Sequence, residues 1–415
     1  MRNPLRRRRL TEATDQQLIQ TGAVAAFGGY GVDPIDGDRG YVPLGQPARA
    51  VPWWTLERAR ASSIAGYRSN PMARAIIDTY TSFVVGDSGL TLQCTNDQVR
   101  AVAEEFWHDP ANCLDDQDIM LRTHLLNGES VYEMMVGDMT GVVRRSVIDP
   151  LIVSDVVLYR GNPLWPAQLV LRPGAGAEPE TLDVIRTDDL SGLRTGEAFF
   201  WRSFRALETD RRGDPFLTPV LDWLDSYDQV MSNLVDRTAV ARYLSAHYKM
   251  KGTQPDGRAW DQQAIDDFVA RRGGNHLPRS GSMEVTNDNV EIEPLNFQSG
   301  SFEDTNTAAT ILTSVAAGAG LSKPWLADPG DANRATSLSM AEPVRRRVGG
   351  VQSLWLGYQT EMVRFAVDRA VAAGRLPSMV PASPDDSPTE WVPAARTVRI
   401  TGPEVAAADS NIVAT

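Results

Sequence analysis

Side chains that could carry out chemistry are few and widely spaced in this 415-residue sequence. The histidines, His108, His124, His247 and His276, lie far apart, and none has the spacing of a metal-ligand pair. CxxC, HExxH and GxSxG motifs do not occur. The stretch GAGLSKP lacks the Lys-Ser/Thr pair and the helix of a phosphate-binding loop. The sequence therefore excludes an ATP-driven motor and favours a chain that is not an enzyme and needs no cofactor.

Two acidic segments could in principle bind a metal ion. The run DDQD at 115–118 precedes a helical pattern, and a two-metal nuclease would need further carboxylates from other strands. Carboxylates at that place also stabilise a helix N-terminus, which is the simpler interpretation. Asp328, Asp331 and Asn333 lie in DPGDANR, which lacks the alternating ligands and final glutamate of a calcium loop. We expect no metal at either segment.

Overall charge limits how the chain can meet nucleic acid. The net charge is −12, which argues against a protein that grips DNA through a basic surface. Acidic walls repel phosphates, so this charge is compatible with DNA that slides past the protein. No run of about 18 apolar residues that could cross a bilayer occurs. Two cysteines are too few for a disulfide framework, and we expect both to be reduced.

Three kinds of segment follow one another along the first half of the chain. Residues 1–50 begin with an arginine-rich run and continue with Gly- and Pro-rich sequence, which predicts a mobile basic arm. Helical periodicity marks 55–85, where Pro71 starts a second helix, and continues through 96–127. Short β-branched and aromatic runs between turn signals predict strands across 128–210. The chain is therefore predicted to be α+β, mainly helical, with a β-rich insertion.

A long helix is predicted from 214 to 245. Asp214 is a good N-cap and Pro215 a good first helical residue, and no glycine interrupts the run that follows. A helix of this length needs packing along most of its surface. The helix expected at 303–318 is a shorter partner, so the remaining surface predicts packing on an identical subunit. The predicted packing stripe consists of Phe216, Leu221, Leu224, Tyr227, Met231 and Leu234.

A small mixed segment and another long helix complete the chain. Residues 246–298 combine strand and helix patterns with Gly/Pro turns, which predicts a separate α/β module. The last long helix is expected at 338–374, kinked near Pro343 and at Gly349-Gly350. The tail from 377 to 404 is Pro-rich and expected to be extended, and EVAAADSNIVAT at the end has a helical pattern.

Four stretches of the sequence have an order and a spacing known from one protein family. They are YRSNPMARAIIDTYTSFVVGDSGLTLQ, LNGESVYEMMV, GDPFLTPVLDWLDSYDQV and AGLSKPWLADPGDANRATSLSMAEPVRRR. Together they resemble portal proteins, the head-to-tail connectors of tailed double-stranded-DNA phages, in particular phages of actinobacterial hosts. The resemblance covers about residues 55–375.

The resemblance implies a portal fold with a definite order of parts. These are a mobile arm at 1–50, a wing at 51–213 with the β-rich insertion, a first stem helix at 214–245, a small α/β clip at 246–298, a second stem helix at 299–320, a tunnel loop at 321–337, a long wing helix at 338–374 and a crown remnant at 375–415. Portals usually carry a larger C-terminal crown, so the short tail departs from the pattern and implies a reduced or truncated crown.

The resemblance implies that the chain forms a homo-oligomer, expected to be a dodecamer. This ring is expected at the capsid portal vertex of a virion, after assembly in the host cytoplasm. The implied partners are the major capsid protein, the terminase large subunit during packaging, a head-tail adaptor, and double-stranded DNA that passes without sequence specificity. No membrane is implied. Candidate DNA-contacting residues of the tunnel loop are Lys323, Asp328, Asp331, Asn333 and Arg334.

Two alternatives stay open at this point. Another oligomeric virion component, such as a head-tail adaptor or a minor capsid protein, would also be acidic and helical, although adaptors are usually much smaller. A metal-dependent DNA-processing enzyme would use the acidic run at 115–118. Particle mass separates the ring from a monomeric enzyme, and nuclease activity lost in Asp115→Ala would favour the enzyme.

Overall fold

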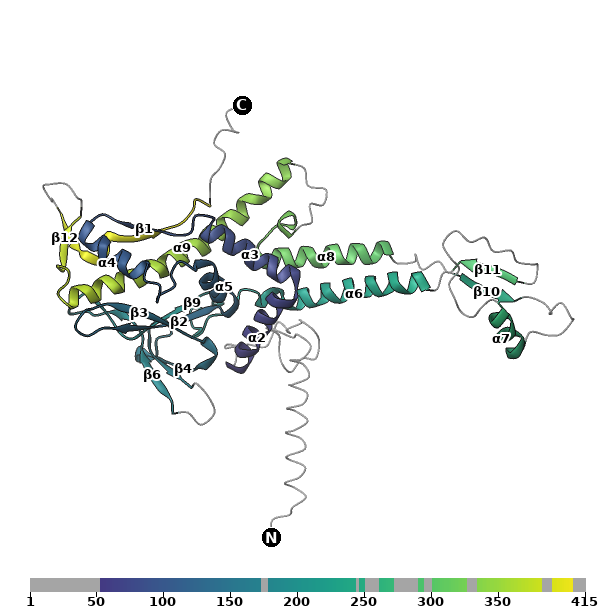
Figure 1. Ribbon diagram of the computed structural model, residues 1–415, viewed down its shortest axis with the longest axis horizontal. Coiled ribbons are helices and arrows are strands. Elements are labelled where there is room, and N and C mark those ends of the chain that lie inside the picture. The colour runs from purple at the N-terminus through teal and green to yellow at the C-terminus, as the bar shows by residue number, and fades with distance from the viewer. Residues whose placement is uncertain are drawn as a thin grey trace, which may run out of the picture. The chain divides into compact units, whose positions relative to one another are not determined.

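The computed structural model describes the chain at 53–172, 178–243, 246–250, 261–271, 290–294, 301–326, 334–382 and 390–405. The predicted basic arm at 1–50 lies outside these residues. The chain forms two compact units: the first combines the residues up to Asp225 with those from Thr313 onward, and the second is Ser226–Leu312. Helices and antiparallel sheets occur together (Figure 1), which confirms the predicted α+β class.

The helices of the first unit follow the predicted pattern. Its first four helices are α2 (Trp53–Ser69), α3 (Pro71–Val85), α4 (Asp97–Trp107) and α5 (Gln117–Asn127). The Asn70 side chain caps α3 by accepting from the N–H groups of Met72 and Ala73, and Pro71 begins the helix as predicted. The helical periodicity of 55–85 corresponds to a core face on α3 that is fully buried at Ile76, Ile77, Tyr80 and Val84.

The β-rich insertion is confirmed and forms two three-stranded antiparallel sheets. In the first, β2 (Glu129–Val136) lies between β3 (Val143–Ile148) and β9 (Ala198–Arg202). In the second, β5 (Pro166–Leu171) lies between β4 (Val153–Leu158) and β6 (Glu180–Asp183). Apolar residues of both sheets form one core, which includes Val131, Ile148, Val156, Leu169 and Phe200. A small two-stranded sheet pairs β7 (Arg186–Thr187) with β8 (Arg194–Thr195).

Helix α9 (Arg334–Ala372) runs along the first unit (Figure 1) and packs on α3 and α4. Its side chains Trp355 and Phe365 are fully buried. Gly374, in the left-handed conformation at φ 77°, follows its end as predicted. The helix begins four residues earlier than expected, so 334–337 are helical although they were assigned to the tunnel loop. Neither proline nor glycine interrupts these residues, which is consistent with the earlier start.

The predicted extended tail forms short strands. β14 (Val398–Thr401) pairs antiparallel with β1 (Thr91–Cys94), and β12 (Met379–Pro381) pairs with β13 (Trp391–Pro393). Val398 and Ile400 are buried, so this part of the tail belongs to the core of the first unit. The last ten residues lie outside the described part of the chain.

The remaining elements are α6 (Leu221–Tyr243), β10 (Ala246–Met250), α7 (Gln262–Arg271), β11 (Val290–Pro294) and α8 (Ser301–Ala319). Strands β10 and β11 pair antiparallel, with Ala246 opposite Pro294. A strand–helix–strand segment between two long helices therefore agrees with the small α/β module predicted there.

Helix α6 begins at Leu221, and the predicted start at residue 214 is wrong. A short 3-10 helix, η3 (Thr218–Val220), precedes it. Two groups that an earlier start would use are not available. Pro219 has no N–H to donate to the previous turn, and the N–H of Phe216 donates to the carbonyl of Leu125 at 2.9 Å. Asp214 is therefore not the N-cap of this helix.

Candidate functional site: the base of the long helices

Only part of the predicted tunnel loop is described. Lys323 begins a short 3-10 helix, η4 (Lys323–Leu326), and its side chain is half-buried. Asp328, Asp331 and Asn333 lie outside the described residues. Arg334 is the first residue of α9, but its side chain is outside the described part as well. Contact between these residues and DNA stays a prediction.

The predicted packing stripe of α6 is buried at one end only. Phe216 and Leu224 are 6% and 3% exposed. Further along, Met231 is 40% exposed. Leu221, Tyr227 and Leu234 are half-buried. The single chain therefore covers the first turns of the stripe and leaves later positions to solvent.

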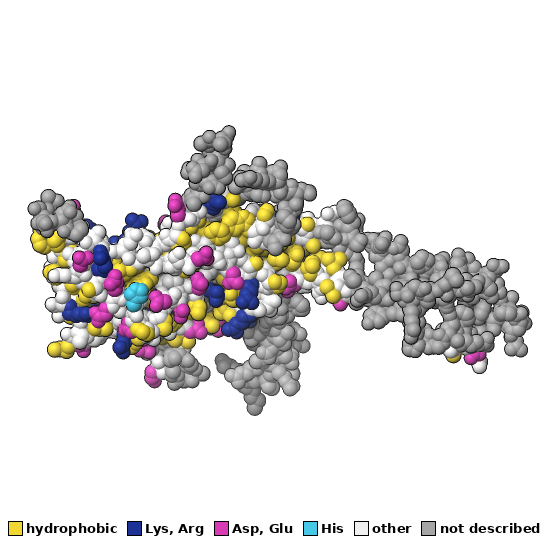
Figure 2. Space-filling view, turned by 45° about the horizontal axis from the view of Figure 1, so that its top comes forward, with side chains coloured by type: hydrophobic (Ala, Val, Ile, Leu, Met, Phe, Trp, Pro, Cys, Tyr) yellow, Lys and Arg dark blue, Asp and Glu magenta, His cyan; other side chains and the backbone are white. Residues whose placement is uncertain are grey.

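A ridge of apolar side chains follows α6 at intervals of four residues. Trp223, Met231 and Val235 are 47%, 40% and 66% exposed, and Tyr227 between them is half-buried. Residues four apart form one of the two ridges by which helices pack together. On the face seen in Figure 2, apolar side chains form a broad area while acidic and basic ones are interspersed elsewhere. Exposed apolar residues in this arrangement are typical of a helix that packs against another subunit.

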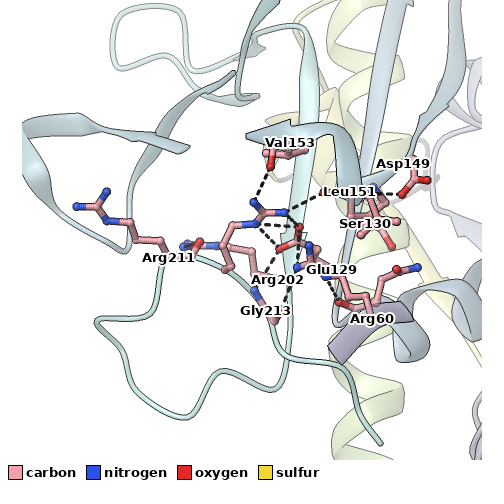
Figure 3. A network of polar contacts seen from close by, with 12 residues as sticks. Arg60, Glu129, Ser130, Asp149, Leu151, Val153, Arg202, Arg211 and Gly213 are labelled. Atoms are coloured by element: carbon pink, nitrogen blue, oxygen red, sulfur yellow. Dashed lines mark hydrogen bonds and ion pairs between the residues drawn. The ribbon is translucent and has the colours of Figure 1, made fainter. Parts of the chain in front are cut away.

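A buried ion cluster fixes the segment that leads into α6 (Figure 3). Glu129, at the start of β2, is 0% exposed. Its Oε1 lies 2.9 Å from Nη2 of Arg60 on α2. Both carboxylate oxygens lie 3.0 Å from Nε of Arg212, and Oε2 accepts from the N–H of Gly213 at 3.2 Å. One carboxylate thus holds α2, β2 and the loop before α6 together.

Backbone carbonyls accept from further donors of the two arginines. Arg60 donates to the carbonyls of Asn127 and Gly213, at 2.9 and 3.3 Å. Arg212 donates to the carbonyls of Val153 and Pro150, at 2.9 and 3.0 Å. A buried ion pair costs solvation unless such hydrogen bonds complete it. The cluster therefore specifies one geometry for this junction, because any displacement leaves a buried charge without partners.

Two glycines let the backbones meet at the same place. Gly128, at φ +72°, would have its Cβ 2.0 Å from the carbonyl oxygen of Asp214 if it were any other residue. Gly213 would place a Cβ 2.1 Å from the carbonyl oxygen of Gly128. Only glycine fits the left-handed conformation of Gly128 at no steric cost, and at both positions a Cβ would collide with the opposite backbone. The end of α5 and the start of the α6 segment are consequently in direct backbone contact.

The C-terminal end of α8 is held on the same unit as the base of α6. The Tyr80 hydroxyl donates to the carbonyl of Ala319 at 2.8 Å, and the Tyr80 ring packs edge-on against Phe216 with centroids 4.6 Å apart. Gly318 faces Val220, whose Cγ1 leaves no room for a larger side chain. The start of α6 and the end of α8 are therefore anchored at neighbouring points of the first unit.

Burial shifts the pKa values of ionisable groups in and around the cluster. Burial lowers the pKa of Arg60 despite the nearby Glu129. Burial, followed by the charge of Asp210, raises the pKa of Asp214 to about 6. Asp214 is thus a half-buried carboxylate near the cluster, and not the helix cap that its position in the sequence suggested.

The other groups that could carry out chemistry are His124, the acidic run at 115–118 and the two cysteines. His124 is buried between the hydroxyls of Ser130 and Ser203, at 2.9 and 2.7 Å, and burial lowers its pKa to about 3. In the acidic run at 115–118, Asp115 lies 3.7 Å from His108. Among the residues that the structure describes, no group of three or more His, Cys, Asp or Glu side chains is placed to hold a metal ion. Cys94 and Cys113 are both free thiols. Within the same residues, no helix is long and apolar enough to span a membrane.

Solved structures with a similar fold come from a gene transfer agent particle. A chain of the virion of a native gene transfer agent particle matches with a TM-score of 0.56 and 14% identity, over 90% of this chain and 89% of that chain. A chain of the neck of the native particle, computed with C12 symmetry, matches with a TM-score of 0.52 and 13% identity, over 85% and 86% of the two chains. The chain shares the fold of these virion components.

A further solved structure is more distant. An HK97-family phage portal protein from Corynebacterium diphtheriae matches with 12% identity over 68% of this chain and 83% of that one, and its TM-score of 0.32 is too low to establish a common fold. No protein-family model and no curated protein matches the chain.

Proposed function

We propose that this chain is a portal-type subunit of a virion neck, which assembles into a homo-oligomeric ring. The observation that carries the proposal is the exposed ridge Trp223, Tyr227, Met231 and Val235 on α6, which needs a partner helix. In a ring, each copy presents this ridge to a different surface of the next copy, so closure leaves no ridge exposed. The fold shared with chains of a particle neck supports this assignment.

In this proposal the parts of the chain take the portal roles. The wing is 51–213 together with the long helix α9, α6 and α8 are the stem helices, and the segment with β10, α7 and β11 is the clip. Adaptor-like alternatives are less favoured because they do not explain a strand–helix–strand segment inserted between two long helices.

The proposed ring lies at one capsid vertex and conducts double-stranded DNA without reading its sequence. A net charge of −12 per chain favours sliding because phosphates are repelled by the walls. The major capsid protein, a terminase and a head-tail adaptor are the proposed partners, and no catalysis or cofactor is involved. The segment from Lys323 to Arg334 is the proposed contact with the DNA.

The experiment is a measurement of particle mass on the purified full chain. The proposal expects a closed ring of copies of the 45.5 kDa chain with a central opening. Met231→Glu and Val235→Glu place charges on the ridge and should shift the population to monomers or small oligomers. Asn233→Glu adds the same charge on the opposite face of α6, where the side chain is also exposed, and should leave the ring intact. Wild-type protein found only as a monomer would contradict the proposal.

A further inference from the structure

A groove of about 570 Å³ opens on the first unit where α9 passes the loop before α6. Its volume lies in the range of sites that bind ligands or short peptide segments. All of its lining belongs to the first unit. The lining consists of the loop 202–208 together with Phe216, Arg347, Gly350, Val351 and Leu354.

Three arginines line the groove without acidic partners. The guanidinium of Arg202 donates to the carbonyls of Pro163 and Arg211, at 2.9 and 3.1 Å. Arg205 and Arg347 make only long hydrogen bonds to carbonyl oxygens, at 3.4 and 3.5 Å. Among the described residues, no carboxylate forms an ion pair with any of the three.

The charge balance of the groove therefore favours an anionic ligand. Glu208 is the one carboxylate in the lining, against the three arginines. Burial, followed by the charge of Arg205, lowers the pKa of Arg202, so the cations already repel one another. Guanidinium groups bind carboxylates through paired, charge-assisted hydrogen bonds. A ligand with carboxylates would relieve the repulsion and satisfy these donors.

Apolar side chains beside the arginines favour a ligand that has an apolar part as well as negative charge. Phe204 and Leu354 line the groove, and Leu354 is 39% exposed. Arg347 lies over the ring of Phe216, 5.9 Å from its centroid. Phe204 has a φ of +57°, a conformation that non-glycine residues adopt at a cost and that occurs preferentially at binding sites. The matching ligand carries carboxylates and an aliphatic side chain together.

We propose that this groove binds the segment Asp33–Asp38 of the chain's own N-terminal arm. The segment reads DPIDGD, with three carboxylates around Ile35 and no lysine or arginine. Its carboxylates pair with Arg205 and Arg347, and Ile35 packs on Phe204 and Leu354. The pairing depends on the charge and shape of the groove and does not depend on ring formation.

The arm is long enough to reach the groove. Fourteen residues lie between Asp38 and Trp53, where α2 begins, and an extended chain over these fifteen residue steps spans roughly 50 Å. Arg60, seven residues into α2, donates to the carbonyl of Gly213, in the loop that leads from the groove to α6. The start of α2 is thus only about 10 Å of helix away from this loop.

The test is site-specific photocrosslinking in the full chain. The photoreactive amino acid p-benzoylphenylalanine replaces Ile35, and crosslinked peptides are identified by mass spectrometry after irradiation. The proposal expects crosslinks to the loop 202–208 or to the α9 segment around Leu354. Arg205→Glu with Arg347→Glu should lower their yield at least about fivefold, because attraction becomes repulsion at two positions. Both side chains make only weak hydrogen bonds, so the variant should fold, and its melting temperature verifies this.

Controls separate the groove from general charge effects. Arg396→Glu with Arg399→Glu reverses two exposed arginines outside the groove and should leave the crosslinks unchanged. Replacing Asp33, Asp36 and Asp38 of the arm by arginine in the Arg205→Glu, Arg347→Glu variant should restore the crosslinks. Crosslinks that map elsewhere, or that persist in the groove variant, overturn the proposal. Duplex DNA binding that is lost in the groove variant, with no Ile35 crosslink in the wild type, assigns the groove to phosphate and also overturns it.

Discussion

Replacing Glu129 by glutamine tests the ion cluster that anchors the base of α6. The amide keeps the size of the side chain but removes the charge that faces Arg60 and Arg212. Glu129 is 0% exposed and the Arg60 side chain 2% exposed, so water cannot replace the lost partner. Breaking a fully buried ion pair by changing one partner costs about 3–5 kcal/mol. We expect Glu129→Gln to lower the free energy of unfolding of the first unit by that amount.

The assay is chemical or thermal unfolding of the purified chain, followed by tryptophan fluorescence. Glu361→Gln is a matched control, because Glu361 also contacts two arginines, Arg194 and Arg364, at 2.7 and 3.1 Å, but is 44% exposed. Exposed ion pairs contribute about 0–1 kcal/mol, so the control should change the unfolding free energy little. Adding Arg60→Met to Glu129→Gln should recover part of the loss, since one unpaired buried cation disappears. Equal effects of Glu129→Gln and Glu361→Gln would refute the reasoning.

Three further predictions concern single residues. Asp214→Asn should raise the free energy of unfolding by about 1–2 kcal/mol at pH 8, after allowance for partial exposure, because burial raises the pKa of the carboxyl to about 6. The wild-type carboxyl stabilises the fold when protonated, so this difference should vanish as the pH falls from about 6 to about 4; a pH-independent effect would count against it. Gly128→Ala should lower the melting temperature clearly, whereas Gly349→Ala, in a helix with no atom near the new Cβ, should not; the comparison fails if both behave alike. The imidazole of His124 should show no NMR titration between pH 5 and 8, since burial lowers its pKa to about 3, and a transition near 6.5 would contradict its placement.

Local patterns were sufficient to predict most elements of the first unit. Pro71 predicts the start of α3, and the helical periodicity of 55–85 predicts an apolar face, which the structure buries at Ile76 and Tyr80. Both signals lie within a few residues of one another. The strands of the insertion were predicted for the same reason. The start of α6 was not, because the N–H of Phe216 is used by the carbonyl of Leu125, a residue distant in the sequence.

The anchoring cluster could not be predicted from the sequence. A glutamate in a strand is normally expected to be exposed, so Glu129 carries no sign of burial in the sequence. Its partners Arg60 and Arg212 are 69 and 83 positions away. Only the folded chain brings them together. The backbone contact between Gly128 and Gly213 has no local signature in the sequence either. The packing stripe that the apolar spacing on α6 predicts does not include Trp223, which is exposed at the start of the ridge.

The measurement that tests the central claim most directly is a reconstruction of the assembled particle at side-chain resolution. We expect a closed ring in which Met231, 40% exposed in the single chain, and Val235, 66% exposed, become buried against the neighbouring subunit. A ring in which the α6 ridge remains exposed to solvent, or a preparation that contains no ring, would contradict the account.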